Sequence, residues 1–552
     1  MIKEEIKEAI RQAVEELQKE KLLPAFATPE ITIEWPRQKD HGDYSSSIAL
    51  KIAGLCKKTK RTPQGVAETL LPRLNEKLRG RVEEIKLVLP GFINFSLAEE
   101  YLCQEIKEIL AIGPSYGQLN VGRGRKIQVE FISANPTGPL TLGNARGGFL
   151  GDTLASVLQA AGWRVEREFY INDTGEQILK LGHSILGDQE AVYQGEYINE
   201  LRAGIGKSKD AKVIGVNGAK VILERLIQPV VEKKMKIKFD RWFWESELHT
   251  AGKIREVVEI LKRKKMTYEK DGALWFKTTQ FGDDKDRVFI KKDGQPTYAL
   301  VDAAYHLDKF KERGFEKVID VWGADHAGDV ARIKAAVEVL GFGERLEIIL
   351  YQFVRLISQG QEVKMSKRAG TYVTVEELID QVGLDAARFF MLTHSADSHL
   401  DFDLELAKEQ SQKNPVFYVQ YAYARICSLL AKYKTGGTRV SVKAVKGKAK
   451  KPVAVENSMA DEWELALIKQ LIKLPEVVEE TAKDYQVQRL PQYALELVRA
   501  FHKFYEECRV ISEDKAQTQS RLDLVKATQI VLRSILDLMG IDAPERMERE
   551  TE

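Results

Sequence analysis

Residues 129–148, VEFISANPTGPLTLGNARGG, decide the fold of this chain. Residues 126–133 just before the turn are rich in β-branched and aromatic side chains, which predicts a strand. Residues 145–161 repeat apolar side chains at helical spacing and stop at Gly162, which predicts a helix. The turn between them is rich in Pro and Gly. Since such a strand–turn–helix presents backbone N–H groups to a phosphate, the turn is predicted to be a nucleotide site.

Length and composition indicate a multidomain globular protein. With 552 residues the chain is too long for one core, and three or four domains are expected. Apolar residues make up 44% of the chain and charged residues 30%, which is typical of soluble globular proteins. The formal charge is only +2, so any RNA-binding surface must be a local basic one.

Cysteine usage and the N-terminal segment indicate a cytoplasmic protein. Cys56, Cys103, Cys427 and Cys508 are far apart and form no C-x-x-C motif, which argues against a structural zinc site and against disulfides. The opening residues, MIKEEIKE, alternate in charge and do not resemble a secretory signal. There is no run of about 18 apolar residues, so no membrane helix is predicted. Nothing in the sequence requires a dimer, and we expect a monomer.

The pattern along the chain predicts a multidomain α/β protein of four units. Residues 1–110 form a small α+β domain. Residues 111–372 alternate strands and helices, which predicts a Rossmann-type catalytic domain with a parallel sheet. This rhythm is lost from about 186 to 289, which we interpret as an insertion between two halves of the sheet. Residues 373–411 are mainly helical, and residues 412–552 are nearly all helix, as in a bundle.

One basic stretch interrupts the C-terminal helices. Residues 432–451 carry eight Lys or Arg and no acidic residue, together with three glycines, which predicts a mobile loop. The loop either lies against RNA phosphate or is simply solvated, and the sequence leaves both readings open.

The nucleotide turn lacks the charge that a triphosphate needs. Gly138 and Gly143 have the spacing of a phosphate-binding P-loop, but Asn144 stands where its Lys should be. The turn does not match the G-x-G-x-x-G of a dinucleotide fold either. The basic, small-residue loop VKMSKRAG at 363–370 offers two lysines that can close over a leaving pyrophosphate. Composition alone would favour a solvated surface loop there.

Several motifs together resemble one family. PTGPLTLGN at 136–144 and KMSKR at 364–368 are similar to the two ATP motifs of class I aminoacyl-tRNA synthetases. The wider context resembles arginyl-tRNA synthetases, and the motifs that carry this resemblance cover essentially the whole chain: GDYS at 42–45, FISANPTGP at 131–139, YINDTG at 170–175, VWGADH at 321–326, NPVFYVQYAYAR at 414–425 and APERM at 543–547.

This resemblance implies a reaction and an ATP site. Arginine would attack the α-phosphate of ATP, bound with Mg²⁺, and the arginyl-adenylate would then esterify tRNA(Arg). Positioning and electrostatics would carry the catalysis. Catalytic roles are implied for Thr141, Gly143, Asn144, Lys364, Ser366 and Lys367. ATP contacts are implied for Pro139, Leu142, Gly323, Asp325 and Met365.

The guanidinium of L-arginine needs a carboxylate partner, because it is always charged. Tyr298 and Asp302 are spaced i, i+4, which places both on one helix face, and they match the residues that hold the guanidinium in the family. A surface helix with an ordinary aspartate is the alternative. The resemblance also places Ser133, Asn135 and His326 near the bound arginine.

The resemblance implies tRNA contacts in three units. The N-terminal domain would touch the tRNA elbow, residues 373–411 the stem, and the C-terminal domain the anticodon arm. Tyr418, Gln420, Tyr421 and Arg425 lie in the matching C-terminal motif, and aromatic side chains suit the stacking of unpaired bases. Such a helical stripe is equally compatible with the core of a bundle. In this family, activation typically depends on bound tRNA.

The chain departs from the family at one motif. Two positions where the family carries His are Thr141 and Asn144 here, and loss of one transition-state donor typically costs about 10²–10³ in rate. In one reading Lys364 and Lys367 compensate in an active synthetase. In another the chain is a weakened, tRNA-binding or regulatory protein, and a different nucleotidyltransferase is a third possibility. We favour the active enzyme, because the rest of the apparatus is present.

Overall fold

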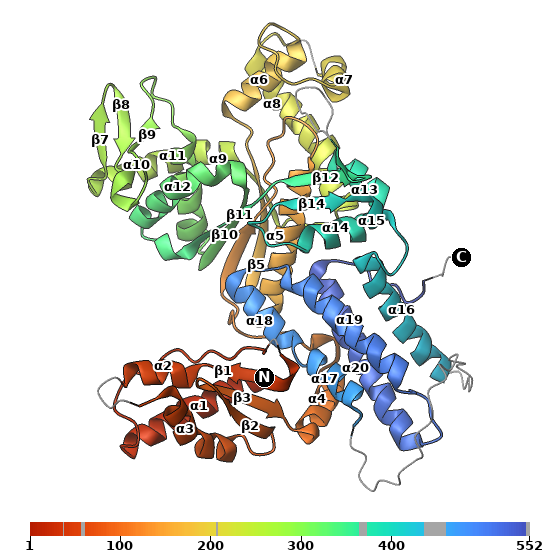
Figure 1. Ribbon diagram of the computed structural model, residues 1–552. Coiled ribbons are helices and arrows are strands. Elements are labelled where there is room, and N and C mark those ends of the chain that lie inside the picture. The colour runs from red at the N-terminus through yellow and green to blue at the C-terminus, as the bar shows by residue number, and fades with distance from the viewer. Residues whose placement is uncertain (37, 57–60, 206–207, 364–372, 435–459, 548–552) are drawn as a thin grey trace.

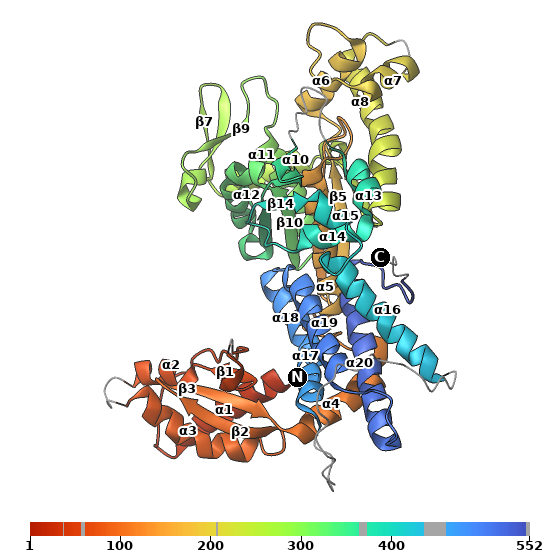
Figure 2. The same cartoon turned by 45° about the vertical axis from the view of Figure 1, so that its right-hand side comes forward.

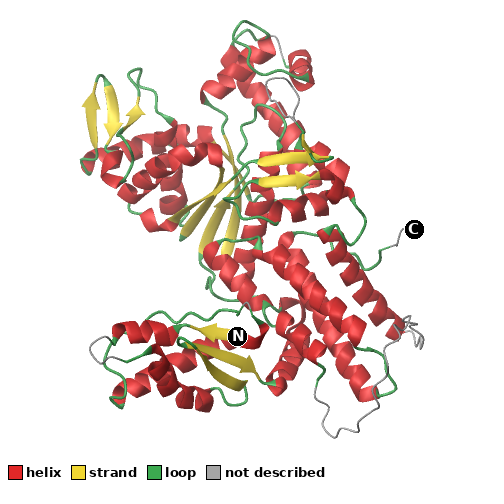
Figure 3. Ribbon diagram, in the orientation of Figure 1, coloured by secondary structure: helices red, strands yellow, loops and turns green. Residues whose placement is uncertain are grey.

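The computed structural model describes residues 1–36, 38–56, 61–205, 208–363, 373–434 and 460–547. A parallel sheet lies at its centre, with helices on both faces and helical units above and below (Figures 1 and 3). Within the described ranges, no helix is long and apolar enough to cross a membrane.

The N-terminal unit packs helices against a small antiparallel sheet of order β1-β3-β2. The apolar side of its first helix is buried, whereas Glu and Lys cover the other side, as its amphipathic sequence requires. The elements of this unit are α1 (Ile2–Lys19), β1 (Tyr44–Ser46), α2 (Ile48–Leu55), α3 (Pro63–Lys77), β2 (Val82–Val88), β3 (Phe92–Leu97) and α4 (Glu99–Ile112).

The central sheet confirms the predicted Rossmann-type architecture. Its order is β11-β10-β4-β5-β6, and all neighbours are parallel. The chain proceeds from β4 through β5 to β6 in one direction and adds β10 and β11 on the other side of β4. The strands are β4 (Lys126–Glu130), β5 (Arg164–Ile171), β6 (Arg241–Trp244), β10 (Lys317–Gly323) and β11 (Leu346–Tyr351).

The predicted strand–turn–helix is present at the heart of this sheet. The strand predicted at 126–133 is β4, and the helix predicted at 145–161 is α5 (Leu142–Ala160), which begins three residues earlier than expected. The predicted insertion at 186–289 is wrong in one respect, because β6 lies inside it and pairs with β5 through Glu168↔Arg241 to Ile171↔Trp244. The strand has only four residues, too few for a clear periodic signal.

Two separate excursions therefore leave the sheet. The first, between β5 and β6, is helical and consists of α6 (Gly175–Leu186), α7 (Glu196–Gly204), α8 (Ala211–Ile222) and the π-helices η4 (Leu223–Ile227) and η5 (Val230–Lys234). The second follows β6 and returns to the sheet through α11 (Tyr298–Leu307) and the π-helix η7 (Asp308–Glu312). Its other elements are α9 (Glu245–Thr250), α10 (Lys253–Arg263), β7 (Thr267–Lys270), β8 (Ala273–Phe276) and β9 (Arg287–Ile290).

The segment after β11 combines a small sheet with the mainly helical stretch predicted at 373–411. α12 (Ala327–Leu340) precedes β11, and a three-stranded sheet of order β13-β12-β14 follows it. This mainly helical segment also contains the short strand β14, which pairs in parallel with β12. The elements here are β12 (Val354–Ser358), β13 (Gln361–Glu362), α13 (Val375–Val382), α14 (Leu384–Leu392), β14 (Leu400–Asp403) and α15 (Leu404–Lys408).

The C-terminal unit is a helical bundle that also contacts the N-terminal unit (Figure 2). Tyr44 Oη donates a hydrogen bond of 2.8 Å to Glu476 Oε1, and Lys469 Nζ lies 2.8 Å from Asp43 Oδ1. The GDYS motif thus docks one unit on the other. The described helices are α16 (Pro415–Lys434), α17 (Glu462–Leu471), α18 (Leu474–Asp484), α19 (Arg489–Glu507) and α20 (Lys515–Met539).

Candidate active site

The sheet topology places a crevice at the carboxyl ends of β4 and β10. The strand order reverses there, and open α/β sheets bind ligands outside the carboxyl ends of the strands at such a switch point. The nucleotide turn follows β4, and residues 323–326 follow β10, so both segments line the same edge. The N-terminus of α5 lies at this edge, with backbone N–H groups available to an anion.

Thr141 and Asn144 cap α5. Asn144 Oδ1 accepts hydrogen bonds from Thr141 N–H, at 2.9 Å, and from the Thr141 hydroxyl, at 3.0 Å. Thr141 and Asn144 therefore bind each other. Within the described chain, Asn144 Nδ2 has no hydrogen-bond partner, which leaves a neutral donor on the first turn of the helix.

Glycines and buried side chains shape the nucleotide edge. A Cβ at Gly143 would meet only Thr141 Oγ1, at 3.8 Å, so space is open above this residue. A Cβ at Gly147 would lie 2.7 Å from the ring of Tyr351, which allows α5 to pack directly on β11. The Leu142 side chain lies in the core, so only its backbone can reach a nucleotide, and Pro139 is partly buried.

The loop after β10 adds polar groups to the crevice. Gly323 ends the strand, and the side chains of Asp325 and His326 are exposed. His326 Nδ1 lies 3.6 Å from Asp329 Oδ2, and Nε2 lies 3.7 Å from Asp325 Oδ2. Hydrogen bonding to Asp329 raises the pKa of His326, which favours the charged imidazolium in this loop.

The second ATP motif, Lys364, Met365, Ser366 and Lys367, lies outside the described residues. The chain that returns from it does contact the nucleotide turn. Thr374 forms a bridge with Thr141, and Val375 N–H donates to the Leu140 carbonyl at 3.0 Å. The described chain at 374–375 therefore lies next to the N-terminus of α5.

Tyr298 and Asp302 share one face of α11, as their spacing predicts. Tyr298 is 55% exposed, and a Cβ at Gly175 would lie 3.6 Å from its hydroxyl. Burial raises the pKa of Asp302 to about 7, with the nearby carboxylates of Glu130 and Glu245 adding to the rise. Within the described chain, no Lys or Arg side chain forms an ion pair with Asp302. A carboxylate so placed is suited to a cationic ligand.

Ser133 joins the ends of β4 and β5. Its hydroxyl donates to Glu130 Oε1 at 2.9 Å and accepts from the Tyr170 N–H at 3.1 Å. Ile132 and Ser133 have positive φ angles of 66° and 38°, so the backbone turns sharply where the strand ends. Ser133 is thus occupied in holding the turn, whereas Asn135 is exposed.

Glu245 is a site residue that the sequence did not reveal. It lies at the carboxyl end of β6, is 4% exposed, and accepts hydrogen bonds from Tyr170 Oη, at 2.8 Å, and from the Thr174 hydroxyl. Asp173 fastens the same turn by accepting from Ser246 N–H at 3.0 Å. Recognition of β6 would have placed this carboxylate beside the end of β5.

Comparisons with known proteins agree with this geometry. Residues 3–97 match the arginyl tRNA synthetase N terminal domain, residues 219–405 the class I (R) tRNA synthetase catalytic domain, and residues 419–547 the DALR anticodon binding domain. Arginine–tRNA ligase 1 of Halalkalibacterium halodurans is 42% identical over 94% of this chain and 95% of its own length. The chain belongs to the arginyl-tRNA synthetase family.

Other family members support this assignment. The arginine–tRNA ligase of Moorella thermoacetica is 44% identical over 94% of each chain. The Thermus thermophilus arginyl-tRNA synthetase structure shares the fold, with a TM-score of 0.76 and 24% identity over 99% of this chain and all of its own. These relatives carry the name of a ligase, and they give no support to a regulatory, non-catalytic protein.

The four residues of the family's C-terminal motif lie on α16 in two environments. Gln420 Nε2 donates to Asp385 Oδ2 at 2.7 Å and to the Asp542 carbonyl at 2.8 Å, so its amide joins neighbouring segments. Arg425 lies over the rings of Tyr421 and Tyr505, at 5.4 and 4.9 Å. Tyr418 packs on His502 with ring centroids 5.0 Å apart.

Proposed function

We propose how this family member carries out arginine–tRNA ligation. As a class I enzyme, the chain activates L-arginine with ATP to arginyl-adenylate and transfers the arginyl group to tRNA(Arg). The observation that carries our assignment of the arginine site is Asp302, a partly buried carboxylate at the edge that also holds the nucleotide turn. Among the described residues, no Lys or Arg forms an ion pair with it.

The guanidinium of arginine binds between Asp302 and Tyr298. The carboxylate supplies the charge, and the tyrosine hydroxyl supplies a hydrogen bond from the same helix face. Glu245 adds a second carboxylate to this region, and Asn135 and His326 lie at the open side, where the α-amino and carboxylate groups of the substrate enter. Ser133 acts through the backbone turn that it holds. Citrulline, which is neutral, would leave Asp302 without a cation.

ATP binds at the N-terminus of α5. The backbone and open space at Gly143, with Pro139 and the backbone of Leu142, receive the nucleotide, while Gly323 and Asp325 form the opposite wall. Asn144 Nδ2 donates to phosphate, and Thr141 holds Asn144 in place. Lys364 and Lys367, with Met365 and Ser366, supply the positive charge to the leaving pyrophosphate. Mg²⁺ arrives with ATP, because this ion is usually bound through substrate phosphates and few protein carboxylates.

tRNA(Arg) binds along three units of a monomer in the cytoplasm. The N-terminal unit, 1–110, contacts the elbow, residues 373–411 contact the stem, and residues 412–552 contact the anticodon arm. Tyr418, Tyr421 and Arg425 offer stacking surfaces for unpaired bases, and Gln420 orients α16. The basic stretch at 432–451, most of which lies outside the described residues, offers further phosphate contacts.

Arginine-dependent ATP–pyrophosphate exchange tests the proposal, measured with and without tRNA(Arg). We expect exchange with tRNA present, and none when citrulline replaces arginine. Absence of exchange at high enzyme concentration with tRNA would overturn the assignment of an active site to Thr141, Asn144 and the lysine loop.

A further inference from the structure

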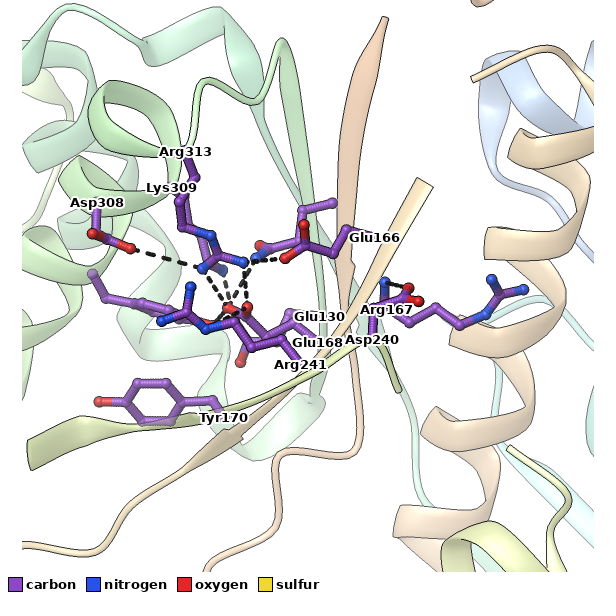
Figure 4. Close-up of polar contacts among 12 residues, drawn as sticks. Glu130, Glu166, Arg167, Glu168, Tyr170, Asp240, Arg241, Asp308, Lys309 and Arg313 are labelled. Atoms are coloured by element: carbon purple, nitrogen blue, oxygen red, sulfur yellow. Dashed lines mark hydrogen bonds and ion pairs between the residues drawn. The ribbon is translucent and has the colours of Figure 1, made fainter. Parts of the chain in front are cut away.

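A buried ionic cluster lies directly behind Asp302. Lys309 Nζ donates to Glu130 Oε2 at 2.6 Å and to Asp320 Oδ1 at 2.9 Å, and its side chain is fully buried. Figure 4 shows Lys309 and Arg313 reaching from the end of the α11–η7 helix toward carboxylates on β4 and β5. Buried charges of this kind persist only when they are paired.

His306 belongs to the same cluster and touches Asp302. Its Nδ1 lies 2.7 Å from the backbone carbonyl oxygen of Asp302, and its Nε2 lies 2.8 Å from Asp320 Oδ2. A carbonyl oxygen accepts only. Asp320 is ionised, since Lys309 and His306 outweigh the effect of burial and lower its pKa. Both ring nitrogens must therefore donate, which makes His306 an imidazolium.

Both oxygens of Glu130 are paired. Its Oε2 accepts from Lys309 and its Oε1 accepts from the Ser133 hydroxyl. Burial raises the pKa of this carboxyl, and the contact with Lys309 opposes that rise. Two carboxylates, Glu130 and Asp320, then balance two cations, Lys309 and His306. With these two carboxylates paired to cations, Asp302 and Glu245 are left without a Lys or Arg partner among the described residues, and Asp302 lies on the same helix face as Tyr298.

The groups that face Asp302 come from several segments. His306 on α11 favours its ionised form, while Glu130 on β4, Glu245 on α9 and Asp320 on β10 oppose it. His326, in the loop after β10, also interacts with Asp302. Removal of His306 would take away the cation on the helix that carries Asp302 itself. Its charged form would then be disfavoured further.

We propose that His306 is a positioning residue for arginine recognition: its imidazolium balances Asp320 and fixes the turn of α11 that carries Asp302, so that Asp302 remains ionised for the guanidinium. This rests on the proposal that Asp302 binds arginine. His306 does not touch the substrate in this scheme, and it acts through the carboxylate that does.

Two neutral substitutions separate charge from scaffolding. In His306→Asn the amide nitrogen replaces Nδ1 and keeps the bond to the Asp302 carbonyl, and in His306→Gln it replaces Nε2 and keeps the bond to Asp320. If the charge matters, both variants should raise the arginine KM about tenfold or more in tRNA-supported exchange, with the ATP KM within about twofold. In both, the pH at which kcat/KM for arginine is half-maximal should move upward.

A purely structural role predicts another pattern. A lower melting temperature with unchanged arginine KM and an unchanged pH midpoint would overturn the proposal. His183→Gln is the matched control, because this histidine lies on α6 and binds Asp188, away from the cluster. In this variant the arginine KM, the ATP KM and the pH midpoint of kcat/KM for arginine should all stay as in the unaltered enzyme.

A double variant distinguishes failure of this inference from failure of the proposed function. If Asp302→Asn leaves the arginine KM unchanged, the proposed arginine site is wrong, and the role of His306 falls with it. Suppose that Asp302→Asn raises the arginine KM, and that adding His306→Gln raises it again by the same factor as in the single His306→Gln variant. Only the role of His306 is then refuted. We expect instead that the second substitution adds little once Asp302 is neutral.

A measurement on the unaltered chain covers the case in which neither variant folds. With ¹⁵N-histidine labelling at the pH of the exchange assay, one of the eight histidines should show an imidazolium signal with both ring nitrogens protonated, and both N–H protons should exchange slowly with solvent because His306 is buried. If no histidine shows such a slowly exchanging imidazolium, the proposal is refuted.

Discussion

Asp302→Asn should weaken arginine binding and at the same time stabilise the folded chain. The substitution keeps the shape of the side chain and removes the charge that we assign to the guanidinium. Loss of one partner in a buried, hydrogen-bonded charge pair costs about 3–4 kcal/mol, which corresponds to a roughly 10²–10³-fold higher KM for arginine. The KM for ATP should change less than about threefold, because Asp302 lies on the arginine side of the crevice.

The gain in stability follows from the raised pKa. Burial raises the pKa of Asp302 from 3.8 to about 7, which corresponds to at most about 4 kcal/mol of destabilisation above pH 7. Since Asp302 keeps partial contact with solvent, we expect its charge to destabilise the folded state by about 2 kcal/mol. A raised carboxylate pKa lowers stability as pH rises from about 4 to 7, so the gain in Asp302→Asn should be full at pH 8 and absent near pH 4.

Pyrophosphate exchange with tRNA present, at varied arginine and ATP, measures the first effect, and thermal melting at pH 8 and pH 5 measures the second. In the unaltered enzyme, kcat/KM for arginine should fall below about pH 7 as Asp302 is protonated, and this fall should be absent in the variant. Asp308→Asn, two turns along the same helical segment and near Arg313, is the matched control. Equal loss for arginine and ATP, or a lower melting temperature at pH 8, would refute the reasoning.

Three further predictions concern other parts of the chain. Thr141→His should raise the rate of adenylate formation about tenfold in single-turnover experiments, and an unchanged rate would remove the position from the phosphate site. Burial raises the pKa of Glu476 to about 7, so its charge destabilises the folded state increasingly from about pH 4.5 to 7. Glu476→Gln should therefore raise the melting temperature at pH 8 but not at pH 4.5. A lower melting temperature at pH 8 would contradict this prediction. Arg425→Ala removes a cation stacked on Tyr421 and should raise the KM for tRNA about tenfold with the arginine KM unchanged. If the variant and the unaltered enzyme have the same KM for tRNA, Arg425 has no role in RNA binding.

Patterns that are local in sequence were predicted well. The strand and helix around the nucleotide turn follow from periodicity over residues 126–161, and the shared face of Tyr298 and Asp302 follows from their i, i+4 spacing. The family resemblance likewise rests on short motifs. Only part of the ATP site is open to comparison, because Lys364 to Lys367 lie outside the described residues.

Features that depend on distant segments were not predictable in this way. β6 was missed because four residues carry no clear period, and with it the position of Glu245 was missed. The meaning of Thr141 and Asn144 also changed, since the hydrogen bonds between them cap α5 and leave only the Asn144 amide as a donor. In sequence these two residues appeared only as a departure from the motif that the family resemblance implies.

The sequence by itself determined the elements and the chemical inventory, because helical and strand periodicity and motif spacing act over a few residues. Only the tertiary structure decided which carboxylate is available to a substrate. In the sequence, Glu130, Asp320 and Asp302 are three similar acidic residues. In the structure, Lys309 and His306 pair with Glu130 and Asp320, and Asp302 keeps its carboxylate for a ligand. Burial and pairing set the charge of such a group, and both depend on residues that meet only when β4, β10 and α11 come together.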